Sequence, residues 1–554
     1  MGSELTSGAA AILCALEAAG ITALFVNLGS DHPAFLAAFA SNKHNIQIFT
    51  SPNEMNALSA ASGFAQITGK PAGVLVHVEC GTQGLAGAIH NVSKGRIPVM
   101  IFAGTVPITM EGEMRGSRNE YIHWIQDVPD QRAIVRQYMK YEHEIRSPHN
   151  AIQIVLRALQ FCMTEPKGPT YLIASRETLE ADTHLPSTKP SQKPELNMAV
   201  EPIGLSPASI EYLAHALVQA ENPLIVTSYC GRSAAGFDAL KSLAQLLAIP
   251  LLASGPPMER RGQLLALAEA DLVLVVDADV PWIGAQSRPK DEARVFHLDS
   301  DPLKDSTTLW SLPCEKRWRA ESSLALTQLL SFITDKALIS DSVKATIASR
   351  TSKLEERFLA RQNRLQTAEV PPSDGSVTVP FVMSRLREAC SGISIVGLNE
   401  STTNLGNVAD HLRHEKPLSL IGSGGGALGW YSGAAVGAYM ALQSQGRDDL
   451  LVAFTGDGTW LFGVPSCAYW MAKRYNTPFL TIIWNNGGWA SPKNACLRIH
   501  DQLSTESNLS EKFGVSLSPS PSFGKIAEGA GGAWWAVIEK ANEKWRVRSG
   551  KLSG

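Results

Sequence analysis

The sequence predicts an α/β protein of three consecutive domains, each with a parallel sheet flanked by helices. Apolar, β-rich runs such as "ALFVNLG" and "AGVLVHV" alternate with helical stretches such as "NEMNALSAASGFAQITG", which is the rhythm of parallel sheets covered by helices. At 554 residues the chain is several times the usual size of one domain. Two polar, Pro-rich breaks divide this rhythm into three series of strands.

The first break, "THLPSTKPSQKPELNMAVEP", precedes a fresh series of strands that begins with "PLIVTSY". The second break, "VPPSDGSVTVP", follows a charged helical stretch and precedes "LLVAFTG" and "PFLTIIWNN". The expected domains therefore cover residues 1–185, 200–345 and 375–554.

The composition excludes several classes of partner. A net charge of −3 gives no electrostatic reason to expect nucleic acid or an anionic membrane. The eight cysteines are scattered without a CxxC pair, as expected of reduced intracellular thiols. No apolar run approaches the roughly 18 residues that cross a bilayer, and no basic segment precedes the apolar N-terminal stretch. We expect a cytoplasmic protein whose partners are small molecules.

An acidic residue between two glycines ends one buried strand of the third domain. Asp457 follows "LLVAFTG", and Asn485 and Asn486 follow the next strand, "FLTIIW". In an open parallel sheet, ligands bind at the edge where the strands end. A carboxylate, an amide oxygen and a backbone carbonyl there suit Mg²⁺ that also holds diphosphate oxygens. A lone GDG is a common turn, but strand, GDG, helix, strand and NN together predict a diphosphate and metal site.

A second glycine cluster, "IGSGGGALGW", also fits the dinucleotide fingerprint that follows a strand. That fingerprint expects an acidic residue about 20 residues further on, and "YSGAAVGAYMALQSQG" offers none there. A nicotinamide site would also leave GDG and NN unexplained. We therefore discount a dehydrogenase.

The segment from GDG to NN resembles the diphosphate-binding motif of thiamine diphosphate enzymes, and the resemblance extends over nearly the whole chain. It implies a pyrimidine-binding first domain, a central domain and a diphosphate-binding third domain. It also implies that Mg²⁺ and the diphosphate are held by five residues of the motif. Asp457, Asn486 and the carbonyl of Gly488 would ligate the metal, and Gly456 and Gly458 would line the diphosphate.

The same resemblance assigns roles at the pyrimidine end. Leu428 matches the apolar wedge that bends the cofactor, and the Gly426 carbonyl would accept from the 4′-amino group; the alternative for Leu428 is plain core. Glu54 resembles the glutamate that bonds the pyrimidine ring nitrogen and promotes the imino tautomer, the alternative being an exposed helix-start residue. Small residues on the flank of its helix, Ala57, Ala60, Ala61 and Gly63, would let paired subunits meet.

The first domain most resembles benzoylformate decarboxylases. Their glycine and serine fall on Gly29 and Ser30, and their histidine on His77. Ser30 would bind the substrate carboxylate and His77 would relay protons, although a packed strand histidine is the alternative. Gln126 lies where acetolactate synthases carry an F-Q-E segment, and would line the site. His32 and His90 receive no role.

Two features depart from the family pattern. Acetolactate synthases bind FAD through the central domain, but the loop within "PLLASGPPMERRGQLLALAEADLVLVV" is shortened, which makes a flavin site doubtful and leaves a nucleotide open. Near the C-terminus, "FGKIAEGAGGAWWAVIEKANEKWRVRSGKLSG" lacks the closing apolar strand of relatives. The last sheet is therefore expected to lack an edge strand, which raises the alternative of a noncatalytic scaffold.

The resemblance as a whole implies a Mg²⁺- and thiamine diphosphate-dependent decarboxylase or carboligase, similar to acetolactate synthases. Its substrate would be a 2-oxo acid, with an aldehyde or a second 2-oxo acid as acceptor. Glu54 and Asp457 should meet across the interface of a homodimer or homotetramer with shared active sites. A carbon–carbon lyase that acts without decarboxylation stays an alternative.

Overall fold

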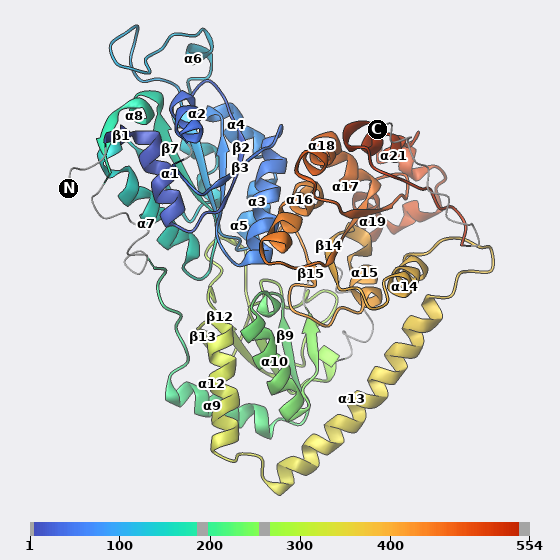
Figure 1. The fold of residues 1–554 in the computed structure, drawn as a ribbon. Coiled ribbons are helices and arrows are strands. Elements are labelled where there is room, and N and C mark those ends of the chain that lie inside the picture. The colour runs from blue at the N-terminus through green and yellow to red at the C-terminus, as the bar shows by residue number, and fades with distance from the viewer. Residues whose placement is uncertain (1–4, 42, 186–197, 254–265, 542–554) are drawn as a thin grey trace. The chain divides into compact units, whose positions relative to one another are not determined.

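The computed structural model describes residues 5–41, 43–185, 198–253 and 266–541. By its internal contacts the chain forms two compact units (Figure 1). Unit 1 consists of Met1–Val200, Cys390–Thr402 and Leu420–Gly554, and unit 2 of Glu201–Ala389 and Thr403–Ser419. Unit 1 contains two parallel sheets and unit 2 contains one. Each unit is described by itself.

The first sheet of unit 1 has six parallel strands in the order β3-β2-β4-β5-β7-β6. Helices cover both of its faces, so its central strands are continuous apolar runs; all five residues of β4, for example, are buried. The strands are β2 Ala23–Asn27, β3 Gln47–Thr50, β4 Ala72–Val76, β5 Val99–Thr105, β6 Tyr141–Ile145 and β7 Thr170–Ser175. The helices are α1 Gly8–Ala18, α2 Pro33–Ala40, α3 Glu54–Thr68, α4 Val78–Gly84, α5 Ala88–Lys94, α6 Ile122–Ile125, α7 Ala151–Met163 and α8 Arg176–Glu180.

The second sheet of unit 1 has four parallel strands in the order β15-β14-β16-β17. Its edge strand β17 is at most half-buried, and no strand follows it among the residues described up to 541. The strands are β14 Ile395–Glu400, β15 Leu420–Ile421, β16 Leu450–Gly456 and β17 Leu480–Trp484. The helices are α16 Trp430–Ser444, α17 Asp457–Phe462, α18 Pro465–Tyr475, α19 Ala490–Ile499, α20 Leu509–Lys512 and α21 Phe523–Gly531.

The two sheets of unit 1 are joined through helices α3 and α16, which lie side by side (Figure 1). A Cβ on Gly63 would come 2.2 Å from the carbonyl oxygen of Ala434, and one on Gly437 would come 1.8 Å from that of Ala60. Only residues without a side chain permit this approach. The small flank of α3 was expected to meet another subunit; that expectation is wrong, because α16 of the same chain fills it.

Unit 2 holds a five-stranded parallel sheet in the order β10-β9-β11-β12-β13. Its strands are β9 Pro223–Thr227, β10 Leu251–Ala253, β11 Leu272–Val276, β12 Arg294–Asp299 and β13 Lys316–Arg319. Its helices are α9 Pro207–Gln219, α10 Ala234–Leu247, α12 Ser322–Asp335, α13 Asp341–Ala368, α14 Val379–Ala389 and α15 Leu405–Leu412. The three helix-flanked parallel sheets confirm the predicted fold class, whereas the domain boundaries at 185–200 and 345–375 stay a prediction. None of the described helices is both long and apolar enough to cross a membrane.

Candidate active site

Asp457 stands where the buried strand β16 ends and α17 begins. Its side chain is buried, at 3% exposure, and its Oδ2 has no hydrogen-bond partner. A buried carboxylate oxygen without a partner costs free energy unless a cation or a donor meets it. No three His, Cys, Asp or Glu side chains of the described residues gather as a metal site, so a cation at Asp457 would depend on neutral oxygens as well. That donor set fits Mg²⁺.

The asparagine pair reaches the same sheet edge from the neighbouring strand. Gly456 pairs with Trp484, so Asn485 and Asn486 leave β17 beside the point where Asp457 leaves β16. The Oδ1 of Asn486 accepts from the amide of Gly488 at 3.1 Å, which holds the turn that presents the Gly488 carbonyl. That these oxygens hold a metal stays a prediction.

Neighbouring atoms crowd the space that a side chain would occupy at Gly458 and Gly488. A Cβ on Gly458 would lie 2.5 Å from the ring of Trp489, and one on Gly488 would lie 2.3 Å from the carbonyl oxygen of Val515. Gly456 has no such crowding, since its nearest neighbour would be 3.9 Å away. Glycine is therefore required sterically at Gly488, where the backbone leaves no room, whereas a side chain at Gly458 would force the Trp489 ring to shift.

The end of strand β14 adds polar groups that the sequence analysis missed. The Oγ1 atoms of Thr402 and Thr459 lie 3.5 Å apart, and Ser401 Oγ accepts from Trp484 Nε1 at 3.2 Å. Glu400 accepts from the amides of the first two residues of α16 at 3.1 and 2.8 Å. Burial raises the pKa of Glu400 to about 8, although these amides oppose the rise. The polar run "NESTTN", which begins in the last two residues of an otherwise apolar strand, is the signal that could have revealed this edge.

The segment with Gly426 and Leu428 is held from the first half of unit 1. Asn91 Oδ1 accepts from the amide of Ala427 at 3.0 Å, and its Nδ2 donates to the carbonyl of Ala427 at 2.8 Å. Leu428 is only partly buried, and Gly426 is exposed. Leu428 is thus not an ordinary core residue. The two hydrogen bonds of Asn91 hold the backbone of Ala427, which lies between the predicted cofactor-binding residues Gly426 and Leu428.

Glu54 is the first residue of α3, and its side chain contacts the last residue of strand β2, Asn27. Its Oε1 accepts from Asn27 Nδ2 at 2.8 Å, and a Cβ on Gly84 would come 2.6 Å from its Oε2. The side chain is partly buried, so it is more than an exposed helix-start residue. No hydrogen bond or ion pair joins Glu54 to Asp457 in the part of the chain that the structure describes. Their meeting across a dimer interface stays a prediction.

His77, Gln126 and the Gly29–Ser30 loop come together beyond strand β4. His77 Nε2 lies 3.0 Å from Gln126 Nε2, and a Cβ on Gly29 would lie 2.0 Å from His77 Nδ1. The carbonyl of Ser30 accepts from Arg176 at 3.4 Å. The sequence analysis missed Asp31, whose Oδ1 lies 2.6 Å from His77 Nδ1. His77 is therefore a hydrogen-bonded and partly exposed group, not a packed strand histidine.

Electrostatics favours the protonated form of His77. Burial lowers its pKa, but hydrogen bonds to Asp31 and Gln126 and the charge of Glu54 raise it, and the net change is upward. Burial also opposes the charged form of Asp31, yet the neighbouring His32 and His77 hold its pKa below the usual value. Three of the four predicted catalytic residues, Glu54, His77 and Gln126, thus occur in one electrostatically connected group.

Comparison with known proteins decides the family. Residues 6–134 match the family model of the thiamine pyrophosphate enzyme N-terminal TPP binding domain, and residues 401–546 match that of the C-terminal TPP binding domain. The chain belongs to the thiamine diphosphate enzymes. The two matched ranges contain every site residue predicted from the sequence.

Several thiamine diphosphate enzymes are similar over most of the chain. Benzoylformate decarboxylase of Pseudomonas aeruginosa is 23% identical over 85% of this chain and 84% of its own. The acetolactate synthase large subunit of Parasynechococcus marenigrum is 23% identical over 87% and 76%, and 2-hydroxyacyl-CoA lyase of Arabidopsis thaliana is 25% identical over 85% and 81%. The solved benzoylformate decarboxylase of Polynucleobacter necessarius shares the fold, with a TM-score of 0.73 at 17% identity over 97% of this chain and 94% of that one.

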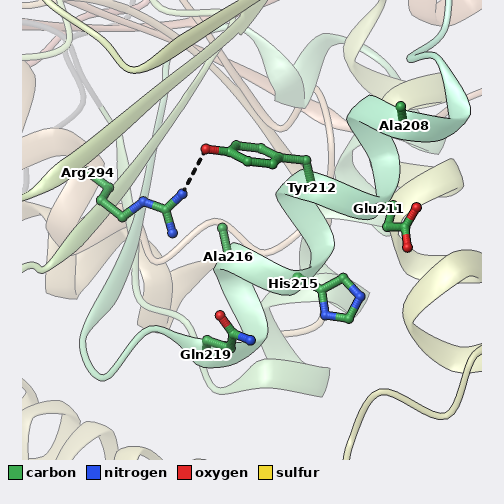
Figure 2. A pocket seen from close by; sticks show the side chains of 7 residues that line it. All are labelled: Ala208, Glu211, Tyr212, His215, Ala216, Gln219 and Arg294. Carbon is green, nitrogen blue, oxygen red and sulfur yellow. Dashed lines mark hydrogen bonds between the residues drawn. The ribbon is translucent and has the colours of Figure 1, made fainter.

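Unit 2 of this thiamine diphosphate enzyme carries a separate cavity of about 360 Å³ on helix α9 (Figure 2). It contains none of the predicted site residues. Its cation, Arg294, is already engaged by Glu315 at 2.8 and 2.9 Å and by the hydroxyl of Tyr212 at 3.2 Å. The hydrogen bond from Arg294 lowers the pKa of Glu315 to about 2. The loop on which the FAD expectation depends includes residues 254–265, which lie outside the described residues.

Proposed function

We propose that the chain is a Mg²⁺-dependent thiamine diphosphate enzyme that decarboxylates a 2-oxo acid and releases the acyl group as an aldehyde or transfers it to an acceptor. The buried, partnerless Oδ2 of Asp457 at the end of β16 carries this proposal. Asp457, Asn486 and the carbonyl of Gly488 would hold the metal, and Gly456 and Gly458 would line the diphosphate.

At the other end, Glu54 would bond the pyrimidine ring nitrogen, Gly426 would accept from the amino group and Leu428 would support the bent cofactor. Bound thiamine diphosphate supplies the electron sink for the bond to the departing carboxylate. The backbone held by Asn91 keeps Gly426 and Leu428 in place before the cofactor enters. Preorganised contacts of this kind lower the cost of ordering the site.

The remaining residues would handle the substrate. Ser30 would bind the carboxylate of the 2-oxo acid, and Gln126 would line the pocket and hold His77. His77 would move a proton at Nε2, and the upward shift of its pKa favours the protonated form that a proton donor needs. We further propose a homodimer or homotetramer and a cytoplasmic location, the latter supported by scattered cysteines without a CxxC pair.

A carbon–carbon lyase is the second candidate, since a 2-hydroxyacyl-CoA lyase is among the similar proteins. The two reactions differ in their products, so a panel of 2-oxo acids and 2-hydroxyacyl compounds separates them. Carbon dioxide release from a 2-oxo acid supports the first proposal, and cleavage without carbon dioxide supports the second. A noncatalytic scaffold has no physical need for Glu54, Asp457 and Asn486 together.

Cofactor binding is tested by isothermal titration of the cofactor-free protein with thiamine diphosphate, with and without Mg²⁺. We expect metal-dependent binding that Asp457→Ala abolishes and Glu54→Gln largely keeps. The matched control is Asp448→Asn, an exposed residue just before β16. Absence of binding by the folded, unmodified protein would contradict the proposal.

A further inference from the structure

Asp31 is a buried carboxylate that the proposed function does not yet use. It follows Ser30 in the loop after strand β2 and is 2% exposed. Its Oδ1 lies 2.6 Å from His77 Nδ1, and its Oδ2 accepts from the amide of Val78 at 3.1 Å. Asp31 therefore contacts both the side chain of His77 and the backbone directly after it.

The fold leaves space for this carboxylate–imidazole pair through two glycines. A Cβ on Gly104, in strand β5, would lie 2.1 Å from Asp31 Oδ2. A Cβ on Gly29 would lie 2.0 Å from His77 Nδ1. Neither contact is sterically permitted, so the ends of three neighbouring strands are shaped around the pair.

The hydrogen bonds assign the proton positions on His77. Because the Asp31 carboxylate only accepts, His77 carries a proton on Nδ1. In the neutral imidazole, Nε2 then accepts from Gln126 Nε2 at 3.0 Å. Gln126 Oε1 is buried without a partner, so a half-turn of its amide would let Oε1 accept from a protonated Nε2. Gln126 can thus accommodate both protonation states.

The other charged or titratable neighbours do not replace Asp31. His32 Nδ1 lies 3.1 Å from Asp31 Oδ1, but it accepts from the amide of Gly29 at 3.1 Å, and burial lowers the pKa of His32. His32 Nδ1 is therefore already engaged by the backbone, and burial disfavours the charged form of His32, although the charge of Asp31 opposes this. Glu54 acts on His77 only through its charge, and Cys80 meets Gln126 at 3.6 Å rather than His77.

We propose that Asp31 is a positioning residue that fixes the Nδ1–H tautomer of His77 and aims Nε2 at the substrate. This inference depends on the proposed function for the reaction that it serves. When the carbon–carboxylate bond breaks and carbon dioxide leaves, one proton passes from Nε2 to the carbon that carried the carboxylate. Nδ1–H stays bonded to Asp31, and a proton from solvent restores the imidazolium.

The test measures the pKa of His77 by NMR of the full chain labelled with ¹⁵N-histidine, with and without thiamine diphosphate and Mg²⁺, using His77→Gln for assignment. In the unmodified protein we expect a pKa above 6.5, and in Asp31→Asn a clear fall. Unmodified protein that titrates at or below 6.5 overturns the inference, and this measurement does not depend on whether the variant folds.

Kinetics supply the second readout. Asp31→Asn should lower kcat by about 100-fold or more with little change in cofactor affinity, as expected when a general acid loses its tautomer and orientation. The matched control is Glu369→Gln, which alters another carboxylate–imidazole contact, the 2.9 Å pair with His411 in unit 2, and should leave kcat unchanged. Unchanged kcat in Asp31→Asn overturns the inference. A raised, Asp31-dependent His77 pKa in a protein that binds no cofactor contradicts the proposed function instead.

Discussion

The polar groups at the strand ends of the two sheets in unit 1 differ in whether they have hydrogen-bond partners. The strand ends of the six-stranded sheet are called the first edge here, and those of the four-stranded sheet the second edge. At the first sheet, the functional groups satisfy one another: Asn27 donates to Glu54, and His77 bonds both Asp31 and Gln126. At the second sheet, Asp457 Oδ2 is buried without a partner. Under the proposed function, the first edge would serve proton transfer and the second would receive a cation. The difference implies that loss of one group affects catalysis at the first edge and cofactor binding and stability at the second.

The largest effect is expected at Asp457, where one substitution should abolish cofactor binding and yet stabilise the cofactor-free protein. Asp457→Asn should abolish stabilisation by thiamine diphosphate with Mg²⁺ and should also raise the Tm of the cofactor-free protein by about 2 to 4 °C, because it removes a buried carboxylate without a partner. Thermal melts of both forms measure this. A lower Tm in the cofactor-free variant would show that Asp457 is satisfied within the protein and would remove the contrast between the edges.

At the first edge, the expected effect is on rate. Glu54→Gln keeps a hydrogen-bonding side chain but cannot share a proton with the pyrimidine, so kcat should fall by about 10²- to 10⁴-fold. Cofactor affinity should change by less than about tenfold. Steady-state kinetics and titration measure the two quantities, with exposed Glu111→Gln as the control. A loss of affinity as large as that of Asp457→Ala would mean that both edges serve binding.

Asn91 connects the edges, since it extends from α5 to the backbone of Ala427. Asn91→Leu should leave the amide and carbonyl of Ala427 unsatisfied and destabilise the protein by about 1 to 3 kcal/mol. Asn91→Asp should also destabilise the protein, because its buried carboxylate would face the carbonyl of Ala427 without a donor. Chemical denaturation compares each variant with the unmodified protein, and unchanged stability of Asn91→Leu would show that the contact does not contribute to stability.

The smallest expected effect is the pH dependence that Glu400 contributes. Burial raises its folded-state pKa from 4.5 to about 8, so the folded protein binds a proton more tightly than the unfolded chain. The contribution of Glu400 to the free energy of unfolding is fully present below pH 4.5 and is lost as pH rises through about 8. Glu400→Gln should therefore show a flatter fall of Tm between pH 5 and 8.5 than the unmodified protein. Parallel pH profiles would indicate that Glu400 is charged in the folded state.

Long-range contacts explain most of what sequence reasoning missed. Asp31 and His77 are 46 residues apart, and Asn91 and Ala427 are 336 apart, so no local pattern connects them. Each side chain by itself is an ordinary loop or helix residue. The flank of α3 was assigned to a subunit interface for the same reason, because small residues indicate close packing without naming the partner.

The sequence by itself determined the fold class, the family, and the residues Asp457, Asn486, Glu54 and His77 as candidates. These depend on strand and helix periodicity and on motifs of fixed spacing at strand ends, which are local properties of the chain. Only the tertiary structure decided which groups are satisfied: Glu54 bonded to Asn27, His77 held by Asp31, and Asp457 without a partner. Burial and hydrogen bonding depend on segments far apart in the chain, and those are brought together only by folding.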